Sequence, residues 1–209
     1  MESFKTISKN STVEIVEKKS RFIANAFYVE TIEEADNYIK EIKKKYHDAR
    51  HNCVAYAIET GDGGLAIKFN DDGEPSGTAG SPMLKVILEK GLSNVLVVVT
   101  RYFGGTLLGT GGLVRAYTEA TIKALETNTY VNKAMGNEIL LEIEYAELEK
   151  VKYYLNKENI KITNINYENN IKLTMDISKE KLNEFTKINS NLPFKILKCD
   201  ILKEKYIEI

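Results

Sequence analysis

The spacing of hydrophobic residues predicts a series of strands in the first part of the chain. Alternating, β-branched and aromatic side chains favour strands near residues 12–17, 21–29, 53–59 and 64–69. The continuous aliphatic run Val95–Val99 predicts a strand that is buried on both faces. Because helical segments separate several of these strands, the pattern indicates a mixed α+β fold.

Three segments carry apolar residues at helical spacing. In the first helix, steps of three and four residues predict a buried stripe of Ile32, Ala35, Ile39, Ile42 and Tyr46. Thr31 and Glu34 form a capping box at its start. Ser81 and Pro82 predict the N-cap and first position of a second helix that runs to about Lys90. The third helix has one apolar face, made of Leu113, Ala116, Tyr117, Ala120 and Ala124.

The pattern changes near residues 131–136, so we expect two domains, residues 1–132 and 136–209. Past the boundary, short alternating segments replace the glycine-rich loops. Strands are expected near residues 139–145, 160–167, 171–177 and 194–202, with helices that begin near Leu148 and after a cap at Ser178. The order β-α-β-β-α-β is that of a ferredoxin-like domain.

Composition narrows the possible functions. The 209 residues are 43% hydrophobic and 28% charged, with a net charge of −1, as in a soluble globular protein. Near neutrality argues against indiscriminate binding of nucleic acid, which needs a basic surface, but it leaves room for a local patch at Lys18, Lys19, Arg21, Arg50 or residues 43–45. The N-terminus lacks a signal-peptide pattern, and the two cysteines are not spaced as in a disulfide-bonded scaffold. We therefore expect a cytoplasmic protein.

Glycine is concentrated between Gly73 and Gly112. The segment Gly109–Arg115 fails the dinucleotide-binding pattern at Val114, and it lacks the lysine of a P-loop. A packing turn would explain the glycines alone. However, Arg115 near a helix start is unfavourable unless an anion lies beside it. The segment therefore predicts an anion or nucleic-acid site, with these members: Arg101, Tyr102, Gly104, Gly105, Gly109, Gly111, Gly112 and Arg115, helped by Lys19 and Arg21.

An acidic loop precedes this segment. Asp71, Asp72 and Glu74 could hold a divalent cation or serve as acid–base groups, but their spacing is not that of an EF-hand. We expect an ordered loop that faces the basic groups, and we predict no metal and no cofactor. The two histidines, His47 and His51, have zinc-like spacing without a third histidine, and we interpret them as polar residues at the end of a helix.

Four motifs together resemble the YigZ/IMPACT family: residues 19–23, 51–56, 71–80 and 101–117, the last beginning Arg-Tyr-Phe-Gly-Gly. The resemblance implies a first domain similar to the α+β fold of ribosomal proteins and elongation factors, and a second domain similar to the last domain of a translocation factor. The eukaryotic members are translational regulators with an additional N-terminal domain that is not expected before Lys18 here. The family offers no catalytic residues to transfer.

The resulting hypothesis is a translation-associated regulatory protein that binds RNA or the ribosome through the glycine-rich, arginine-flanked anion site. One alternative is a magnesium-dependent enzyme acting on a small phosphorylated metabolite, with its metal at the acidic loop. Another is a protein-interaction module whose glycine loops shape a docking surface. The sequence leaves the ligand, the protein partner and the oligomeric state open, and it predicts no membrane association.

Overall fold

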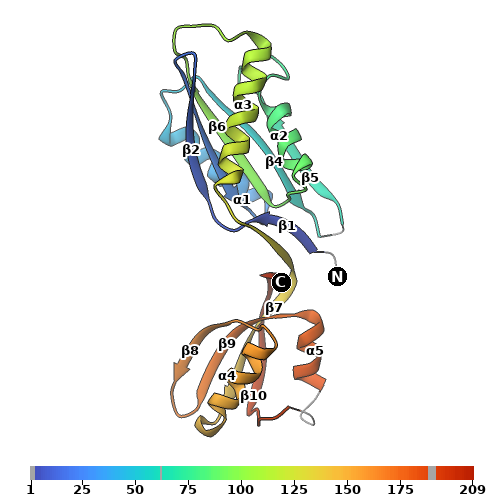
Figure 1. The fold of residues 1–209 in the computed structure, drawn as a ribbon. Coiled ribbons are helices and arrows are strands. Elements are labelled where there is room, and N and C mark those ends of the chain that lie inside the picture. The colour runs from blue at the N-terminus through green and yellow to red at the C-terminus, as the bar shows by residue number, and fades with distance from the viewer. Residues whose placement is uncertain (1–2, 62, 188–191) are drawn as a thin grey trace. The chain divides into compact units, whose positions relative to one another are not determined.

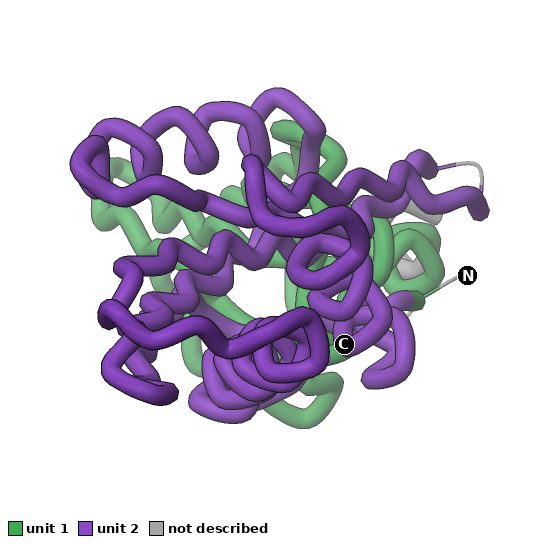
Figure 2. The backbone as a smooth tube through the Cα atoms, turned by 90° about the horizontal axis from the view of Figure 1, so that it is seen from above, with its two compact units in different colours: residues 1–3, 132–209 green, residues 4–131 purple. Residues whose placement is uncertain are grey.

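The computed structural model describes residues 3–61, 63–187 and 192–209. The chain divides into two compact units (Figure 2). We call Phe4–Val131 (purple, labelled unit 2 in Figure 2) the first unit, and residues 1–3 with 132–209 (green, labelled unit 1) the second unit. Both contain helices and a sheet, which confirms the α+β fold class. Among the described residues, no helix is both long enough and apolar enough to cross a membrane.

The Phe4–Val131 unit is built on a five-stranded antiparallel sheet (Figure 1). Its strands, in spatial order, are β2 (Ser11–Glu17), β3 (Ser20–Tyr28), β6 (Val95–Tyr102), β4 (His51–Glu59) and β5 (Leu65–Asn70). The four strands predicted before Val95 and the aliphatic strand itself are all present. The sequence pattern missed β1 (Ser3–Ile7), which pairs in parallel with Leu92 through Lys5.

Helices cover both faces of this sheet (Figure 1). On one face lies α1 (Ile32–Lys45), and on the other lie α2 (Gly80–Glu89) and α3 (Gly109–Glu126). Side chains of the central strand β6 point alternately to the two faces of the sheet. Leu96 and Val98 pack in the cluster with α1. Val95, Val97 and Val99 pack in the cluster with α2 and α3. Residues 95–99 are fully buried, which confirms the predicted two-sided burial.

Two details of the predicted helix starts are wrong. Ile32 is 47% exposed, so the buried part of α1 is formed by Ala35 and Ile42, with Ile39 and Tyr46 partly buried. In α2, Ser81 is not the N-cap, because the helix begins one residue earlier, at Gly80. A Cβ on Gly80 would lie 2.7 Å from the backbone nitrogen of Asn70, so glycine allows the helix start to approach β5 closely.

The second unit has the predicted β-α-β-β-α-β order. Its elements are β7 (Tyr130–Ile143), a 3₁₀ turn (Tyr145–Glu147), α4 (Leu148–Lys157), β8 (Ile162–Tyr167), β9 (Ile171–Ser178), α5 (Lys179–Lys187) and β10 (Lys198–Glu208). The neighbours β10-β7-β9-β8 are all antiparallel, as in a ferredoxin-like sheet. Ser178 Oγ accepts a bond from Lys181 N (3.3 Å), as predicted. The last strand begins at Lys198, later than predicted, because Phe194 packs into the core outside any strand.

Candidate functional site

The acidic loop is a hub of internal hydrogen bonds. The carboxylate of Asp71 accepts from the backbone N–H groups of Gly77 (2.8 Å), Ala79 (3.0 Å) and Gly80 (2.8 Å). The last two are at the start of α2, where no side chain of the helix itself supplies a cap. Asp71 therefore satisfies helix donors that would otherwise lack a partner. It is the cap that the sequence pattern assigned to Ser81.

Asp72 ties the same loop to the start of β4 and to α1. Its carboxylate accepts from Asn52 N (2.7 Å) and from Lys43 Nζ (2.7 Å). His51 Nδ1 lies 2.9 Å from the carbonyl oxygen of Asp72. Because a carbonyl only accepts, Nδ1 carries the proton in this arrangement. In the neutral ring, Nε2 is then the acceptor nitrogen.

Glu74 and Arg101 form a buried ion pair. Arg101 Nη1 donates to both carboxylate oxygens of Glu74, at 2.8 and 3.1 Å, and Tyr117 Oη donates to one of them at 2.8 Å. Arg101 is 7% exposed and Glu74 is 8% exposed. The expectation that Arg101 offers a second free charge to an anion is therefore wrong, because a carboxylate in the interior already compensates it.

Two further residues complete this buried cluster. Ser20 Oγ accepts from Gly104 N (3.1 Å) and lies 3.4 Å from Arg101 Nη2. Phe22 packs edge-on against Tyr117, with ring centroids 5.1 Å apart. Sequence reasoning missed Ser20 as a member of the site, although it lies in the motif of residues 19–23. The cluster joins β3, β6, α3 and the acidic loop.

Cys53 lies next to this cluster and is not poised for nucleophilic chemistry. Its Sγ donates to the carbonyl oxygen of Asp71 (3.0 Å), and the residue is fully buried. Burial raises the pKa of the Cys53 thiol to about 12. Burial likewise raises the pKa of Tyr117, with Cys53 and Glu74 adding to the effect. A reactive cysteine needs the opposite shift.

The predicted glycine turn is the first turn of α3. Gly109 is the first helical residue and Gly111 and Gly112 follow it within the helix. Arg115 is thus in the second turn, and the argument that placed its charge against the end of the helix dipole does not hold. No side chain caps the start of α3. Arg115 is exposed, and no described residue forms an ion pair with it.

The turn between β2 and β3 lies at the same end of the sheet as the loop that precedes α3 (Figure 1). We call the exposed side chains of Lys18, Lys19, Arg21, Phe103 and Arg115 the basic turn surface. The two lysines form the turn between β2 and β3, with φ values of 46° and 66°. Such left-handed pairs are typical of two-residue hairpin turns. Phe103 is 52% exposed in the loop between β6 and α3.

This surface rests on a tight backbone contact. A Cβ on Gly104 would lie 2.0 Å from the carbonyl carbon of Lys19, so only glycine allows the loop to touch the hairpin turn. Gly105 has a φ of 82°, which also favours glycine. The Arg21 guanidinium lies 5.5 Å from the Tyr102 ring centroid. Its charge is shared with Glu14, at 2.8 Å, so the lysines and Arg115 are the more available cations.

The histidines do not form a metal centre with their neighbours. The interpretation of both histidines as residues at the end of a helix is wrong, because α1 ends at Lys45 and His51 begins β4. The zinc-like spacing therefore does not place the two rings on one helical face. Within residues 3–61, 63–187 and 192–209, no three His, Cys, Asp or Glu side chains are grouped as metal ligands.

Near His47, Tyr102 Oη donates to Asp48 (2.7 Å), and this bond raises the pKa of Tyr102.

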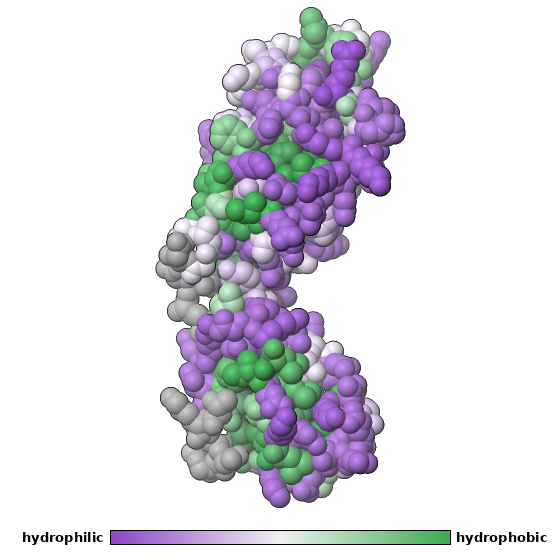
Figure 3. Space-filling model, turned by 180° about the vertical axis from the view of Figure 1, so that it is seen from behind, coloured by the Kyte–Doolittle hydropathy of each residue, from purple (hydrophilic) through white to green (hydrophobic). Residues whose placement is uncertain are grey.

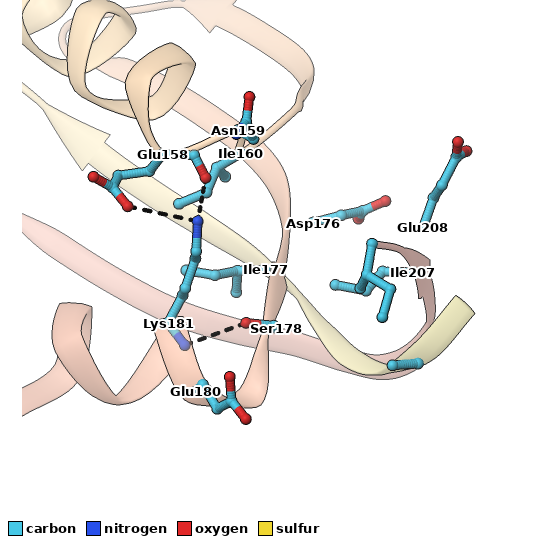
Figure 4. Close-up of a pocket in the computed structure, with 12 residues that line it drawn as sticks. Glu158, Asn159, Ile160, Asp176, Ile177, Ser178, Glu180, Lys181, Ile207 and Glu208 are labelled. Atoms are coloured by element: carbon cyan, nitrogen blue, oxygen red, sulfur yellow. Dashed lines mark hydrogen bonds and ion pairs between the residues drawn. The ribbon is translucent and has the colours of Figure 1, made fainter. Parts of the chain in front are cut away.

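The second unit contains a pocket of about 390 Å³ (Figure 4). Isoleucines form part of its wall, and Glu180, Glu208 and Asp176 contribute carboxylates. Lys181 spans one side, where its Nζ contacts both the backbone carbonyl and the carboxylate of Glu158. None of the sequence motifs falls on these residues, so the candidate site remains the cluster and basic turn surface of the first unit.

Comparison with known proteins agrees with the motifs. The model of the family described as Impact N-terminal domain matches residues 18–125, and a domain of unknown function (DUF1949) matches residues 141–187. The IMPACT family member YvyE of Bacillus subtilis is 38% identical over 89% of this chain and 85% of its own length. YigZ of Escherichia coli is 38% identical over 81% of this chain and 83% of its own.

A solved structure has the same architecture. The crystal structure of a hypothetical protein aligns over 94% of this chain and 97% of its own, with a TM-score of 0.62 and 34% identity. The structural alignment covers both units, and the two sequence relatives align with most of the chain. The chain belongs to the IMPACT family.

Proposed function

We propose that this chain is a translation-associated regulatory protein and that its basic turn surface binds the sugar-phosphate backbone of RNA. The observation that carries the proposal is the set of exposed cations without acidic partners. Lys18, Lys19 and Arg115 have no ion-pair partner among the described residues. The translational part follows from the family resemblance, because eukaryotic members are translational regulators.

The chemistry of the surface suits single-stranded RNA. Phe103, the residue before Gly104, presents a half-exposed ring, and a base can stack on such a ring regardless of sequence. The cations can then neutralise adjacent phosphates. Because Gly104 packs directly on the hairpin turn, the ring and the lysines are held on one scaffold. This arrangement favours binding through the backbone and stacking over base-specific readout.

The alternative magnesium enzyme has less support. Asp71 directs its carboxylate at three backbone N–H groups, and Asp72 accepts from Asn52 and Lys43. Glu74 is occupied by Arg101 and Tyr117. To bind a divalent cation, these oxygens would have to give up bonds that hold the loop and α2 together.

The decisive experiment removes charge from the hairpin without disturbing its backbone. Lys18→Asn combined with Lys19→Gly supplies the residues that this two-residue turn prefers. Binding of a fluorescent single-stranded RNA is measured by anisotropy at several salt concentrations. We expect weaker binding and a slope of log affinity against log salt that is shallower by about 1.4, for two lost phosphate contacts.

A matched control removes two exposed lysines elsewhere, Lys44→Ala with Lys161→Ala. This variant has the same net charge as the hairpin variant. If the two variants lose affinity equally, attraction is a property of overall charge and the assignment of the surface is wrong. Co-sedimentation with ribosomes, done with the same pair, tests whether the RNA concerned is ribosomal.

A further inference from the structure

Strand β5 is an exposed edge of its sheet. It ends the strand order β2-β3-β6-β4-β5, and its partner on the inner side is β4. Three of its side chains are large, apolar and exposed: Leu65 (42%), Ile67 (47%) and Phe69 (51%). Figure 3 shows hydrophobic residues gathered on the surface of this unit. An exposed, regular, hydrophobic edge strand is a template for pairing with another strand.

The three apolar residues share one face of the sheet. Phe69 pairs with Ala55 and Ile67 with Ala57, and both alanines belong to the core that packs against α2 and α3. Opposite residues in an antiparallel pair lie on the same face. The apolar side chains of β5 therefore continue the core face outward, past the sheet edge. On the other face, Lys68 is paired with Asp36 of α1, at 3.1 Å.

Three other edge strands carry protecting features, whereas β5 has one charged residue, Lys68, and no bulge. Strand β2 carries exposed Glu14 and Glu17. In the second unit, β8 is interrupted by a register shift between Ile162 and Asn164, and β10 by one between Ile201 and Lys203. Charges and bulges of this kind prevent edge-to-edge association. The register of β5 with β4 has no such shift.

We propose that β5 pairs with β5 of a second copy of this chain, antiparallel and centred on Ile67, to give a two-fold symmetric dimer. This register places Ile67 opposite Ile67 of the other copy and Leu65 opposite Phe69, so apolar residues meet on one face. Lys68 is opposite Ala66, and its charge is already compensated by Asp36. Centring on Lys68 instead would oppose two lysines, which is unfavourable. The strand is thus complementary to itself.

The test measures molar mass by light scattering during size-exclusion chromatography. The native chain is expected at twice 23.6 kDa, the mass of one chain. Ile67→Lys should elute as a monomer, and because Ile67 is already half-exposed, circular dichroism should show an intact fold. Val16→Lys is the matched control on the β2 edge, where Val16 is 63% exposed, and it should remain dimeric.

A cross-link tests the register. In a Cys199→Ser background, Ile67→Cys should form an intermolecular disulfide, because directly opposite Cα atoms lie within disulfide range. Val16→Cys should not. A monomeric native chain at the highest attainable concentration overturns the proposal, as does a dimer that persists in Ile67→Lys. If β5 instead pairs with a strand of a different protein, the purified native chain will be monomeric, which also overturns the proposal.

Discussion

Arg101 and Arg115 flank the same glycine-rich segment, yet the fold uses them in opposite ways. Arg101 is buried against Glu74, whereas Arg115 is exposed and has no acidic partner among the described residues. The comparison extends to their surroundings. Residues around Arg101 fix the acidic loop to the sheet and α3, and residues on the basic turn surface face solvent. One motif therefore contains both a scaffold and the surface that the scaffold supports.

The largest expected effect on stability comes from removing the carboxylate of the buried pair. Glu74→Gln leaves the Arg101 charge uncompensated in the interior, and we expect a loss of about 3 kcal/mol in the free energy of unfolding. Urea denaturation followed by circular dichroism measures it. Below the transition, the folded variant should keep its affinity for RNA, since Glu74 is not on the basic turn surface.

The control is the exposed pair between Glu14 and Arg21, in which both side chains are about half-exposed. Glu14→Gln should change stability little, because solvent screens such pairs. It should instead strengthen RNA binding slightly by freeing Arg21. If both variants lost the same stability, burial would not distinguish the two arginine environments, and the division into scaffold and surface would be unfounded.

The next effect concerns the contact that joins scaffold to surface. Gly104→Ala places a methyl group against the backbone of Lys19, where neither side can move cheaply. Overpacking of this kind costs roughly 1–3 kcal/mol. We expect reduced thermal stability and weaker RNA binding together, because the hairpin lysines shift relative to Phe103. Thermal melts and anisotropy on one preparation measure both.

Gly111→Ala is the paired control, because a Cβ there would meet nothing within 4 Å. Alanine also favours helix over glycine by up to about 1 kcal/mol. Stability should therefore stay constant or rise, with RNA binding unchanged. A comparable loss in both variants would mean that the glycines serve the helix start in common and that the Lys19 contact has no special role.

Local patterns in the sequence predicted most of the elements, because alternation and helical spacing report burial directly. Val95–Val99 and the stripe near Ala120 were of this kind. Two of the misses depend on a partner outside the element concerned. The cap of α2 comes from Asp71 rather than Ser81, and the charge of Arg101 is compensated by Glu74. Neither interaction leaves a periodic signal.

The loop cap offers a smaller test of the scaffold. Asp71→Asn retains one acceptor oxygen where the carboxylate had two, and it removes the charge that faces the start of α2. We expect a loss of about 1–2 kcal/mol in the free energy of unfolding, the range for helix caps. Asp36→Asn, at an exposed pair with Lys68, is the control and should have a much smaller effect. Equal losses would show that Asp71 does not cap the helix.

The smallest effect concerns the buried thiol beside the ion pair. The pKa of Cys53 is raised to about 12 in the folded protein, from 9.0 in the absence of burial. The unfolded chain therefore releases this proton first, and the corresponding stability, complete below pH 9, is lost progressively between pH 9 and pH 12. From pH 9 to pH 10 the loss is about 1 kcal/mol. It is measured as the change in the free energy of unfolding.

Tyr117 also contributes in this range, because burial raises its pKa in the folded protein while the unfolded chain ionises it readily. The informative quantity is therefore a difference between two proteins. Cys53→Ala removes the thiol and leaves Tyr117 in place. Its cavity lowers stability equally at every pH, so subtracting the two pH profiles cancels that cost and leaves the contribution of the thiol, including its part in raising the pKa of Tyr117. The native profile should fall more steeply than that of the variant. Parallel profiles would mean that Cys53 ionises in the folded protein as readily as in the unfolded chain, which is incompatible with a fully buried thiol near the Glu74 carboxylate.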